Sequence, residues 1–176
     1  LGLSADTEFS DKISSHHGLT FLSNSDCHSP CPHRLGREFN RLEMKELSFK
    51  GLKDTILRKG DQGITLNVGL DPREGKYHCT ACQDCYTKFS LEDAQQFQWR
   101  CPECGKSIKK GVKDRIFELG DSENGPEWRP DYTHLPPLAI LIQSVIGHSS
   151  PTTKTIQKIW KDYIDCYSSA IEVLLE

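Results

Sequence analysis

The sequence predicts a mixed α/β protein that carries a small cysteine-rich metal module and ends in helices. Three observations lead to this prediction. Strand-like and helix-like apolar patterns alternate in the first 74 residues, five cysteines crowd between residues 79 and 104, and helical apolar spacing fills the C-terminal part. We therefore divide the chain into residues 1–74, 75–119 and 120–176.

The composition places the chain among globular proteins. Of its 176 residues, 36% are apolar and 27% are charged, which argues against disorder and against a membrane protein. The net charge of −3 gives no global attraction for nucleic acid, so binding to a polyanion needs a local basic surface. No signal peptide or membrane-spanning apolar run is present, and the first residue is Leu rather than Met. We expect a cytoplasmic protein without a membrane partner, processed or truncated from a longer one.

The first 74 residues contain two strand candidates and one helix. Residues 18–22 form a short buried-strand candidate, and residues 63–71 alternate well enough for a strand that an Asp-Pro turn closes. Between them, residues 47–59 predict a helix with Ser48 as N-cap and Gly60 as its C-terminal stop. The apolar residues expected on one face of this helix are Leu52, Ile56 and Leu57.

The C-terminal part predicts two helices after a linker. Residues 120–134 resemble a linker packed by its aromatic residues, and Pro137 suits the first turn of a helix that Gly147 ends. Ser150-Pro151 then predicts a new helix start. Its apolar residues keep the i, i+3, i+4, i+7 spacing almost to the end of the chain, which is most simply a core-facing stripe.

The strongest signal in the sequence is a pair of Cys-x-x-Cys units, Cys82/Cys85 and Cys101/Cys104, separated by fifteen residues. Each unit makes a tight turn whose thiolates converge, and two such turns supply the tetrahedral sulfur set that Zn²⁺ prefers. Four thiolates leave no position for water, so the zinc is expected to be structural. A pairing of Cys79 with Cys82 stays open as an alternative, as does a plain structural role for Cys79.

The charge becomes basic around the second unit. Phe97, Trp99 and several cations follow one another there, the cations being Arg100, Lys106, Lys109, Lys110, Lys113 and Arg115. Basic residues among aromatic ones can follow a phosphate backbone and stack on bases. A solvated basic face around a small zinc-module core is an equally good interpretation.

Residues 21–30, Phe-Leu-Ser-Asn-Ser-Asp-Cys-His-Ser-Pro, place Asp26 and His28 two residues apart after a strand-like segment. A carboxylate and an imidazole suit Zn²⁺, Mn²⁺ or Fe ions, and in α/β barrels functional groups lie at strand C-termini. The alternative is a polar turn in which Asp26 bonds its own backbone. Two ligands do not complete a catalytic centre, and this chain contains no His-x-His, so the remaining ligands must come from elsewhere.

Several longer motifs resemble endonuclease Q, a DNA-repair enzyme of the PHP (polymerase and histidinol phosphatase) superfamily. The resemblance covers nearly the whole chain and is carried by residues 2–6, 22–30, 34–40, 46–52, 75–78, 129–138 and 173–176. It implies that residues 1–74 are the C-terminal part of a distorted TIM-like barrel. A zinc-finger module and a helical C-terminal segment follow the barrel in that family.

The resemblance also implies an activity and site residues. The family nicks DNA on the 5′ side of deaminated bases such as uracil and hypoxanthine, with divalent metals (Zn²⁺, Mn²⁺, Fe²⁺ or Mg²⁺) at its catalytic centre. Its Asp-x-His ligands correspond to Asp26 and His28, and its zinc ligands to the four paired cysteines. The earlier barrel strands with their His-x-His have no counterpart here, so activity is expected only with the missing barrel portion or a companion chain.

Residues just beyond the Asp-x-His are candidates for DNA contact. Arg34 and Arg37 can clamp a phosphate, because a guanidinium fork matches its oxygens; the alternative is an ion pair with Glu38 or Glu43. The competing function is a non-catalytic, zinc-stabilised module that binds DNA or protein. A phosphatase of small phosphate monoesters is less favoured, because such an enzyme has little use for a basic zinc module.

Overall fold

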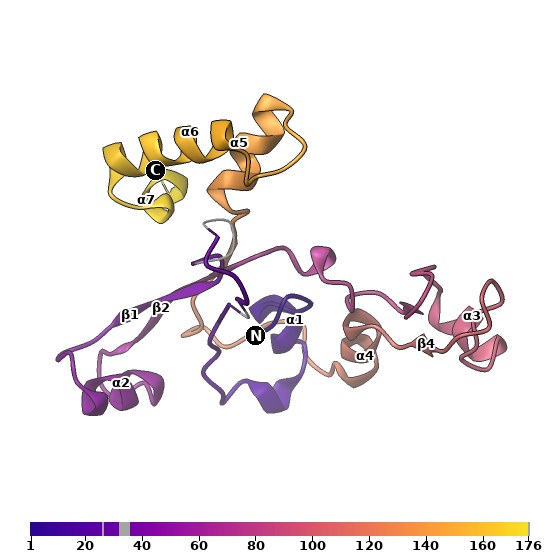
Figure 1. The fold of residues 1–176 in the computed structure, drawn as a ribbon. Coiled ribbons are helices and arrows are strands. Elements are labelled where there is room, and N and C mark those ends of the chain that lie inside the picture. The colour runs from indigo at the N-terminus through magenta and orange to yellow at the C-terminus, as the bar shows by residue number, and fades with distance from the viewer. Residues whose placement is uncertain (26, 32–35, 176) are drawn as a thin grey trace.

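The computed structural model describes residues 1–25, 27–31 and 36–175. Its elements group into a sheet with short helices around it, a cysteine module and a C-terminal helical segment, as Figure 1 shows. The cysteine module and helix α2 lie at opposite ends of the molecule in that view. A mixed α/β fold with a cysteine module and C-terminal helices is therefore confirmed.

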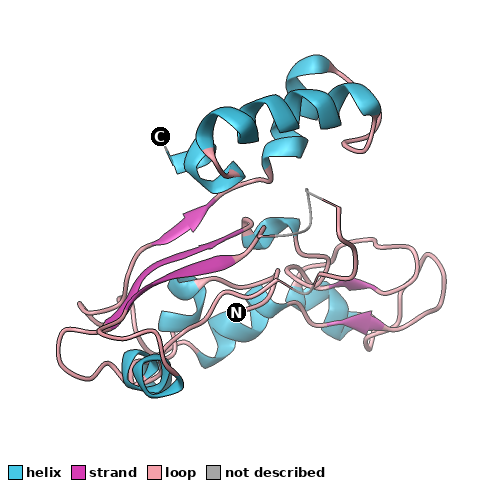
Figure 2. Cartoon of the chain, turned by 60° about the vertical axis from the view of Figure 1, so that its left-hand side comes forward, coloured by secondary structure: helices cyan, strands magenta, loops and turns pink. Residues whose placement is uncertain are grey.

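The main sheet has three strands in the order β1-β2-β5, which lie side by side below the C-terminal helices in Figure 2. Strands β1 (Phe39–Glu43) and β2 (Gly63–Gly69) are antiparallel, with a register shift between Arg41 and Leu42. Strand β5 (Tyr132–His134) runs parallel to β2. The strand predicted at 63–71 is confirmed, whereas the linker predicted for 120–134 contains β5.

The strand predicted at residues 18–22 is wrong, because this segment extends beside the sheet without pairing as a strand. Its carbonyl oxygens accept hydrogen bonds from side chains instead of from a neighbouring strand. Arg58 and Arg129 donate to the carbonyls of Gly18 and Leu19, and Asn67 donates to that of Phe21. These bonds satisfy the backbone of the segment, so it needs no neighbouring strand.

Helix α2 (Phe49–Ile56) begins as predicted, with the Ser48 hydroxyl accepting from the Gly51 amide at 2.9 Å. It ends earlier than predicted, at Ile56 rather than next to Gly60. Of the three apolar residues expected on one face, Leu52 and Leu57 are exposed, at 38% and 54%. The buried residues are Gly51, Asp54 and Thr55, on the other side of the helix.

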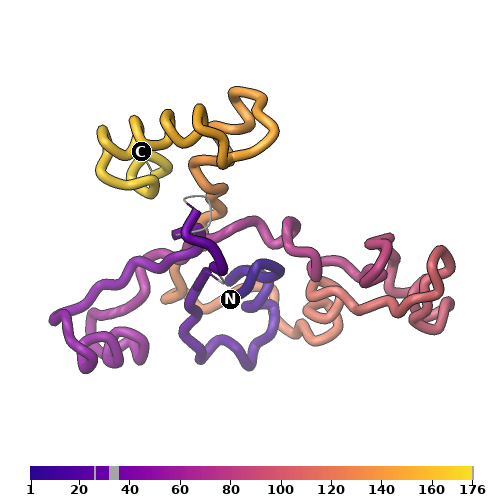
Figure 3. The backbone as a smooth tube through the Cα atoms, in the orientation of Figure 1, coloured from indigo at the N-terminus to yellow at the C-terminus, as the bar shows by residue number. Residues whose placement is uncertain are grey.

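Short helices tie the first segment to the rest of the chain. Helix α1 (Thr7–Asp11) lies beside α4 (Val112–Leu119), as Figures 1 and 3 show, and the rings of Phe9 and His78 meet edge to face at 5.4 Å. Single 3-10 turns follow at Ser14–His16 and Pro72–Glu74. The N-terminal segment is thus packed against the segment that leads into and out of the cysteine module.

The C-terminal segment contains α5 (Leu138–Ile146), α6 (Lys154–Tyr167) and α7 (Ala170–Leu175). Gly147 ends α5 in the left-handed conformation, as predicted. The helix start predicted at Ser150-Pro151 is wrong, because α6 begins at Lys154 after a turn, and Ser168 interrupts the final stripe. Four residues form the buried core of this segment: Leu138, Ala139, Ile142 and Ile156.

Within the described part of the chain, no helix is long and apolar enough to cross a membrane. This agrees with the absence of a long apolar run in the sequence.

Candidate metal centres

The two Cys-x-x-Cys units meet at one point of the cysteine module. Strands β3 (Ala81–Cys82) and β4 (Ile108–Lys109) pair antiparallel, and helix α3 (Leu91–Gln96) covers them through Ala94. This core is very small, with Cys82, Ala94, Cys101 and Ile108 as its buried members. A core of this size rarely supports a fold without a metal or disulfides, so we expect the cysteines to stabilise the module.

Each unit forms a tight turn closed by a left-handed residue. Tyr86 follows Cys85 at φ 59°, and Gly105 follows Cys104 at φ 72°. In the second turn the Gly105 amide donates to the Cys101 carbonyl at 2.8 Å. Glycine suits the position of Gly105, because left-handed backbone is least strained in glycine.

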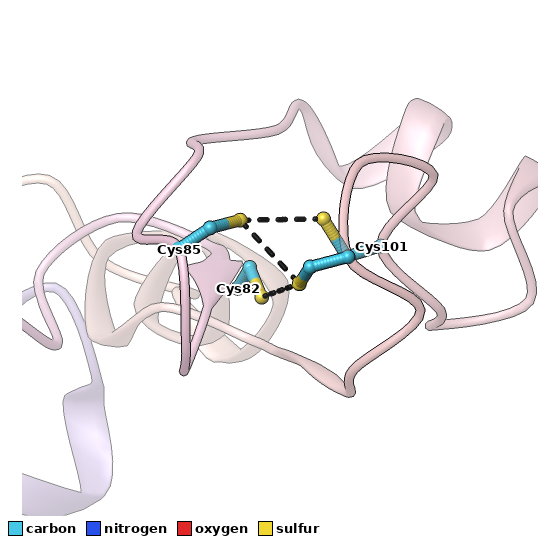
Figure 4. Close-up of side chains that lie close together, drawn as sticks. Cys82, Cys85 and Cys101 are labelled. Carbon is cyan, nitrogen blue, oxygen red and sulfur yellow. Dashed lines mark hydrogen bonds between the residues drawn. The ribbon is translucent and has the colours of Figure 1, made fainter.

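The four sulfur atoms have the spacing of a zinc site. They lie within 4.8 Å of one another, and the sulfurs of the three labelled residues in Figure 4 converge. The separations are 3.4 Å for Cys82–Cys104, 3.5 Å for Cys85–Cys101 and 3.6 Å for Cys85–Cys104. Tetrahedral Zn²⁺ with Zn–S bonds of about 2.3 Å requires sulfurs roughly 3.8 Å apart, so the four cysteines suggest a structural zinc site.

The thiols influence one another strongly. The Thr87 hydroxyl and backbone amide lower the pKa of Cys85 to about 6, while burial raises the pKa of Cys101. At Cys104 the Lys106 amide acts to lower the pKa, but burial and the three neighbouring thiols outweigh it and raise the value to about 12. Four thiolates at this spacing repel one another, and a divalent cation at their centre allows all of them to ionise.

Cys79 does not join this group. Among the described residues, the His, Cys, Asp and Glu side chains that could hold a metal form one cluster, which contains Cys82, Cys85, Cys101 and Cys104. Cys79 is half-buried next to Thr80, whose hydroxyl accepts from the Gly111 amide at 2.9 Å. The preference for Cys82 and Cys85 over a pairing of Cys79 with Cys82 agrees with this geometry.

The basic residues around the module differ in their availability. Lys109 is exposed on β4. Lys110 forms an ion pair with Glu118 at 2.6 Å and lies over the Trp99 ring at 5.5 Å. Arg115 also pairs with Glu118, at 3.0 Å. Part of the basic face expected from the sequence is therefore neutralised by Glu118.

The segment that leads to the Asp-x-His pair is fixed at Ser23, which is completely buried. Its hydroxyl donates to the Val68 carbonyl of β2 at 2.9 Å and lies 3.1 Å from the Tyr132 hydroxyl of β5. Asp26 lies outside the described residues, and His28 is exposed. Ser23 thus lies beside the C-terminal end of β2, because Val68 is one residue before the end of that strand.

Two asparagines complete this anchor. The Asn40 side chain accepts from the Ser23 amide at 2.7 Å and donates to the Ser23 carbonyl at 2.9 Å. Asn67, 1% exposed, donates to Asn40 at 2.7 Å. This network was not predicted from the sequence, although Asn67, a polar residue in the middle of the apolar strand 63–69, was a usable signal.

The two arginines expected near the site have different outcomes. Arg34 lies outside the described residues. Arg37 forms an ion pair with Glu38 at 2.7 Å, and both side chains are below 10% exposed. The alternative considered for Arg37, an ion pair with Glu38, is therefore what the structure contains.

A polar cleft of about 590 Å³ opens beside this region. Its lining includes five acidic side chains together with Arg129 and His134. The His134 ring at the end of β5 lies 3.0 Å from the buried carboxylate of Asp6, the N-cap of α1. Neither residue was singled out from the sequence.

Comparisons with known proteins show what this chain is similar to. Two solved structures match 98% of the chain at 50% identity: the lesion-specific endonuclease PfuEndoQ from Pyrococcus furiosus, with a TM-score of 0.89, and an endonuclease Q complex with a 27-mer duplex substrate that has an abasic lesion at the active site, with a TM-score of 0.92. The chain matches the C-terminal portion of endonuclease Q.

Two further proteins are similar to the chain in sequence. The chain is 49% identical over 181 residues to the uncharacterized protein MJ0043 of Methanocaldococcus jannaschii, and 39% identical over 159 residues to the uncharacterized protein YqxK of Bacillus subtilis. Residues 137–176 match the family model of the MJ0043 C-terminal domain.

The chain is much shorter than the proteins that it matches. It spans 43% and 44% of the two solved structures, and 22% and 38% of the two sequence relatives. More than half of each endonuclease Q chain therefore has no counterpart in these 176 residues.

Proposed function

We propose that the chain is the C-terminal portion of a metal-dependent DNA-repair endonuclease, which hydrolyses the phosphodiester bond on the 5′ side of deaminated bases such as uracil and hypoxanthine. The observation that carries the proposal is the 50% identity, over 98% of the chain, to two endonuclease Q structures. One of those relatives is described as lesion-specific, and the other holds a damaged DNA duplex at its active site.

In this proposal residues 1–74 form the closing part of a PHP-type barrel, 75–119 the zinc module and 120–176 the linker and helical segment. The parallel pairing of β2 with β5 supports a barrel origin of the sheet, because PHP barrels resemble the parallel TIM barrel. Strand β5 also ties the third segment to the first. We place the whole protein in the cytoplasm.

Asp26 and His28 are the proposed catalytic metal ligands. Ser23 and its asparagine partners hold the segment that leads to these two residues against the sheet, which supports the proposal. Bound Zn²⁺, Mn²⁺, Fe²⁺ or Mg²⁺ would supply a hydroxide near neutral pH and neutralise charge on the phosphate. Two ligands are too few for such a centre, so the proposal assigns the others to the missing barrel portion or a companion chain.

DNA contacts are proposed for Arg34, Arg37, Lys109 and Lys110. Lys109 is the best supported of these, because it is exposed on the zinc module. Lys110 and Arg37 would have to exchange their carboxylate partners, Glu118 and Glu38, for phosphate. Such contacts would act through charge and carry little sequence information.

The test uses residues 1–176 joined behind the preceding portion of the P. furiosus endonuclease. Asp26→Asn is expected to abolish nicking of duplexes that contain uracil or hypoxanthine, with the circular-dichroism spectrum unchanged. Asp165→Asn on the exposed side of α6 is the matched control and should retain full nicking. Unchanged nicking by the Asp26 variant would remove this residue from the site.

A zinc-stabilised binding module without catalysis is the second candidate. It is favoured by one observation: the metal-ligand cluster found among the described residues consists of the four cysteines alone. Metal analysis of the 176-residue chain separates the two. One tightly held zinc per chain supports a binding module or a fragment, and two or more metals support a complete catalytic centre.

A further inference from the structure

Helix α2 turns its apolar side away from the protein. Phe49, Leu52 and Ile56 follow each other at i, i+3 and i+7, which places them on one face of the helix. Phe49 is 83% exposed and Leu52 38% exposed. A short surface helix normally buries this face, so the orientation of α2 is the reverse of the usual one.

The side of α2 that contacts the protein is small and polar. Thr55 is completely buried, and its hydroxyl donates to the Gly51 carbonyl at 2.9 Å. A side chain at position 51 would meet the Glu46 carbonyl oxygen at 2.2 Å, so glycine is required there. The Thr20 hydroxyl donates to the Ile56 carbonyl at 2.7 Å and fixes the C-terminal end of the helix. The Thr55 hydroxyl also reaches the Glu43 carbonyl of β1 at 3.4 Å, and together with the Thr20 bond this contact holds α2 in its orientation.

The residue before the N-cap adds to the exposed side. Leu47 is 99% exposed, although an apolar residue at this position commonly packs on the fourth helical residue, here Leu52. We name Leu47, Phe49, Leu52 and the half-buried Ile56 the α2 face. Water contact with such a group of large apolar side chains is unfavourable by about 25 cal/mol per Å², which favours a covering partner.

Helix α2 lies at the end of the molecule, far from the cysteine module and from helices α5 to α7 (Figure 1). No segment among the described residues covers its apolar side, since Phe49 and Leu47 remain almost fully exposed. The covering partner must therefore come from outside these residues.

We infer that the α2 face is the surface on which the preceding portion of an endonuclease Q-like protein docks, within the same polypeptide. The inference rests on the proposed function. More than half of each endonuclease Q structure has no counterpart in this chain, which provides an occupant. A stable complex of separate chains needs about 800 Å² and 20–30 residues a side, far more than four side chains offer. A portion that is covalently linked is already at high effective concentration and needs less contact area.

The test compares two proteins, residues 1–176 alone and the same residues joined behind the preceding portion of the P. furiosus endonuclease. Amide hydrogens of residues 47–60 are expected to exchange at least ten-fold more slowly in the joined protein. Equal exchange in the two proteins would overturn the inference. Protection that grows with the concentration of the 176-residue chain would also overturn it, because a second copy would then be the occupant.

A variant adds a second readout. Phe49→Asp is expected to lower the Tm of the joined protein by at least about 5 °C and to leave the Tm of the 176-residue chain unchanged. Phe117→Asp, the same change at a residue 60% exposed on α4, is the matched control and should lower neither. An equal loss in both proteins, or an equal loss from both substitutions, contradicts a docking role of α2.

Two further measurements distinguish a failure of the docking inference from misfolding of the joined protein and from a failure of the proposed function. If the joined protein does not fold, the substitution is made at the aligned position of the full-length P. furiosus endonuclease, where the same drop in Tm is expected and an unchanged Tm refutes the inference. Nicking is measured on the same samples. Protection of α2 without nicking would refute the proposed function and leave the docking surface standing. Nicking without protection would refute the docking surface and leave the proposed function standing.

Discussion

The Arg129 Nε lies 2.6 Å from Asp11 Oδ2, and the two side chains are only 4% and 8% exposed. The guanidinium group also lies 3.8 Å from the centre of the Phe21 ring and donates to the Leu19 carbonyl at 2.8 Å. One side chain thus joins helix α1, the extended segment 18–22 and the loop before β5. This buried pair links α1 to the loop that leads into β5.

Asp11→Ala should therefore destabilise the protein strongly. It leaves the Arg129 charge buried without its carboxylate, and breaking a buried pair in this way costs about 3–5 kcal/mol of unfolding free energy. Urea denaturation followed by circular dichroism measures the loss. Asp165→Ala removes the exposed pair with Lys161 and serves as the control, with an expected loss below about 1 kcal/mol. Similar losses for the two variants would contradict a central role of Arg129.

Asn40→Ala should loosen the segment that carries Asp26 and His28. It removes the acceptor of the Ser23 amide and the donor to the Ser23 carbonyl, and unpaired buried groups cost about 1–3 kcal/mol each. We expect faster hydrogen exchange at residues 22–25 together with a lower free energy of unfolding. Asn124→Ala, in an exposed loop, should change neither quantity. Unaltered exchange in the Asn40 variant would show that Val68 and Tyr132 alone hold Ser23.

Zinc removal should unfold the cysteine module and spare the C-terminal helices. A chelator, or Cys101→Ser, removes the support of a core with four buried members, whereas α5 to α7 have a separate core. Hydrogen exchange should become fast at residues 81–109 and stay unchanged at 138–146, with metal content falling by about one zinc per chain. Cys166→Ser, at an exposed cysteine on α6, is the control. Persistent protection of residues 81–109 without metal would refute a structural zinc.

Acid should weaken the turn after β2. The Arg73 guanidinium and backbone amide hold the pKa of the Asp71 carboxyl well below its usual range. A carboxyl whose pKa is lowered on folding contributes its full stabilisation above the unfolded value of about 3.9 and loses it as the pH falls further. The wild-type protein should therefore exceed Asp71→Asn in urea midpoint at pH 6, with a difference that shrinks below pH 4. A difference independent of pH would assign the effect to hydrogen bonding alone.

Local sequence patterns determined the structural features that depend on residues close to one another along the chain. The Cys-x-x-Cys spacing determined the four-sulfur cluster, because each turn is closed by its own backbone bonds and a left-handed residue. Ser48 and Gly147 likewise marked a helix start and a helix end through local capping. The resemblance to endonuclease Q rested on motifs of the same local kind, and the structural match confirmed it for the C-terminal portion.

Only the tertiary structure decided which sides of these elements are buried and which distant groups meet. Periodicity placed apolar residues on one face of α2, but only the burial of Gly51 and Thr55 shows that the opposite side contacts the protein. Strand β5 escaped detection because its three residues form a strand only through pairing with β2. The bonds of Ser23 to Asn40 and Val68 span 17 and 45 residues, and Arg129 reaches Leu19 across 110 residues. Such contacts depend on the folded arrangement of the chain, which no local pattern contains.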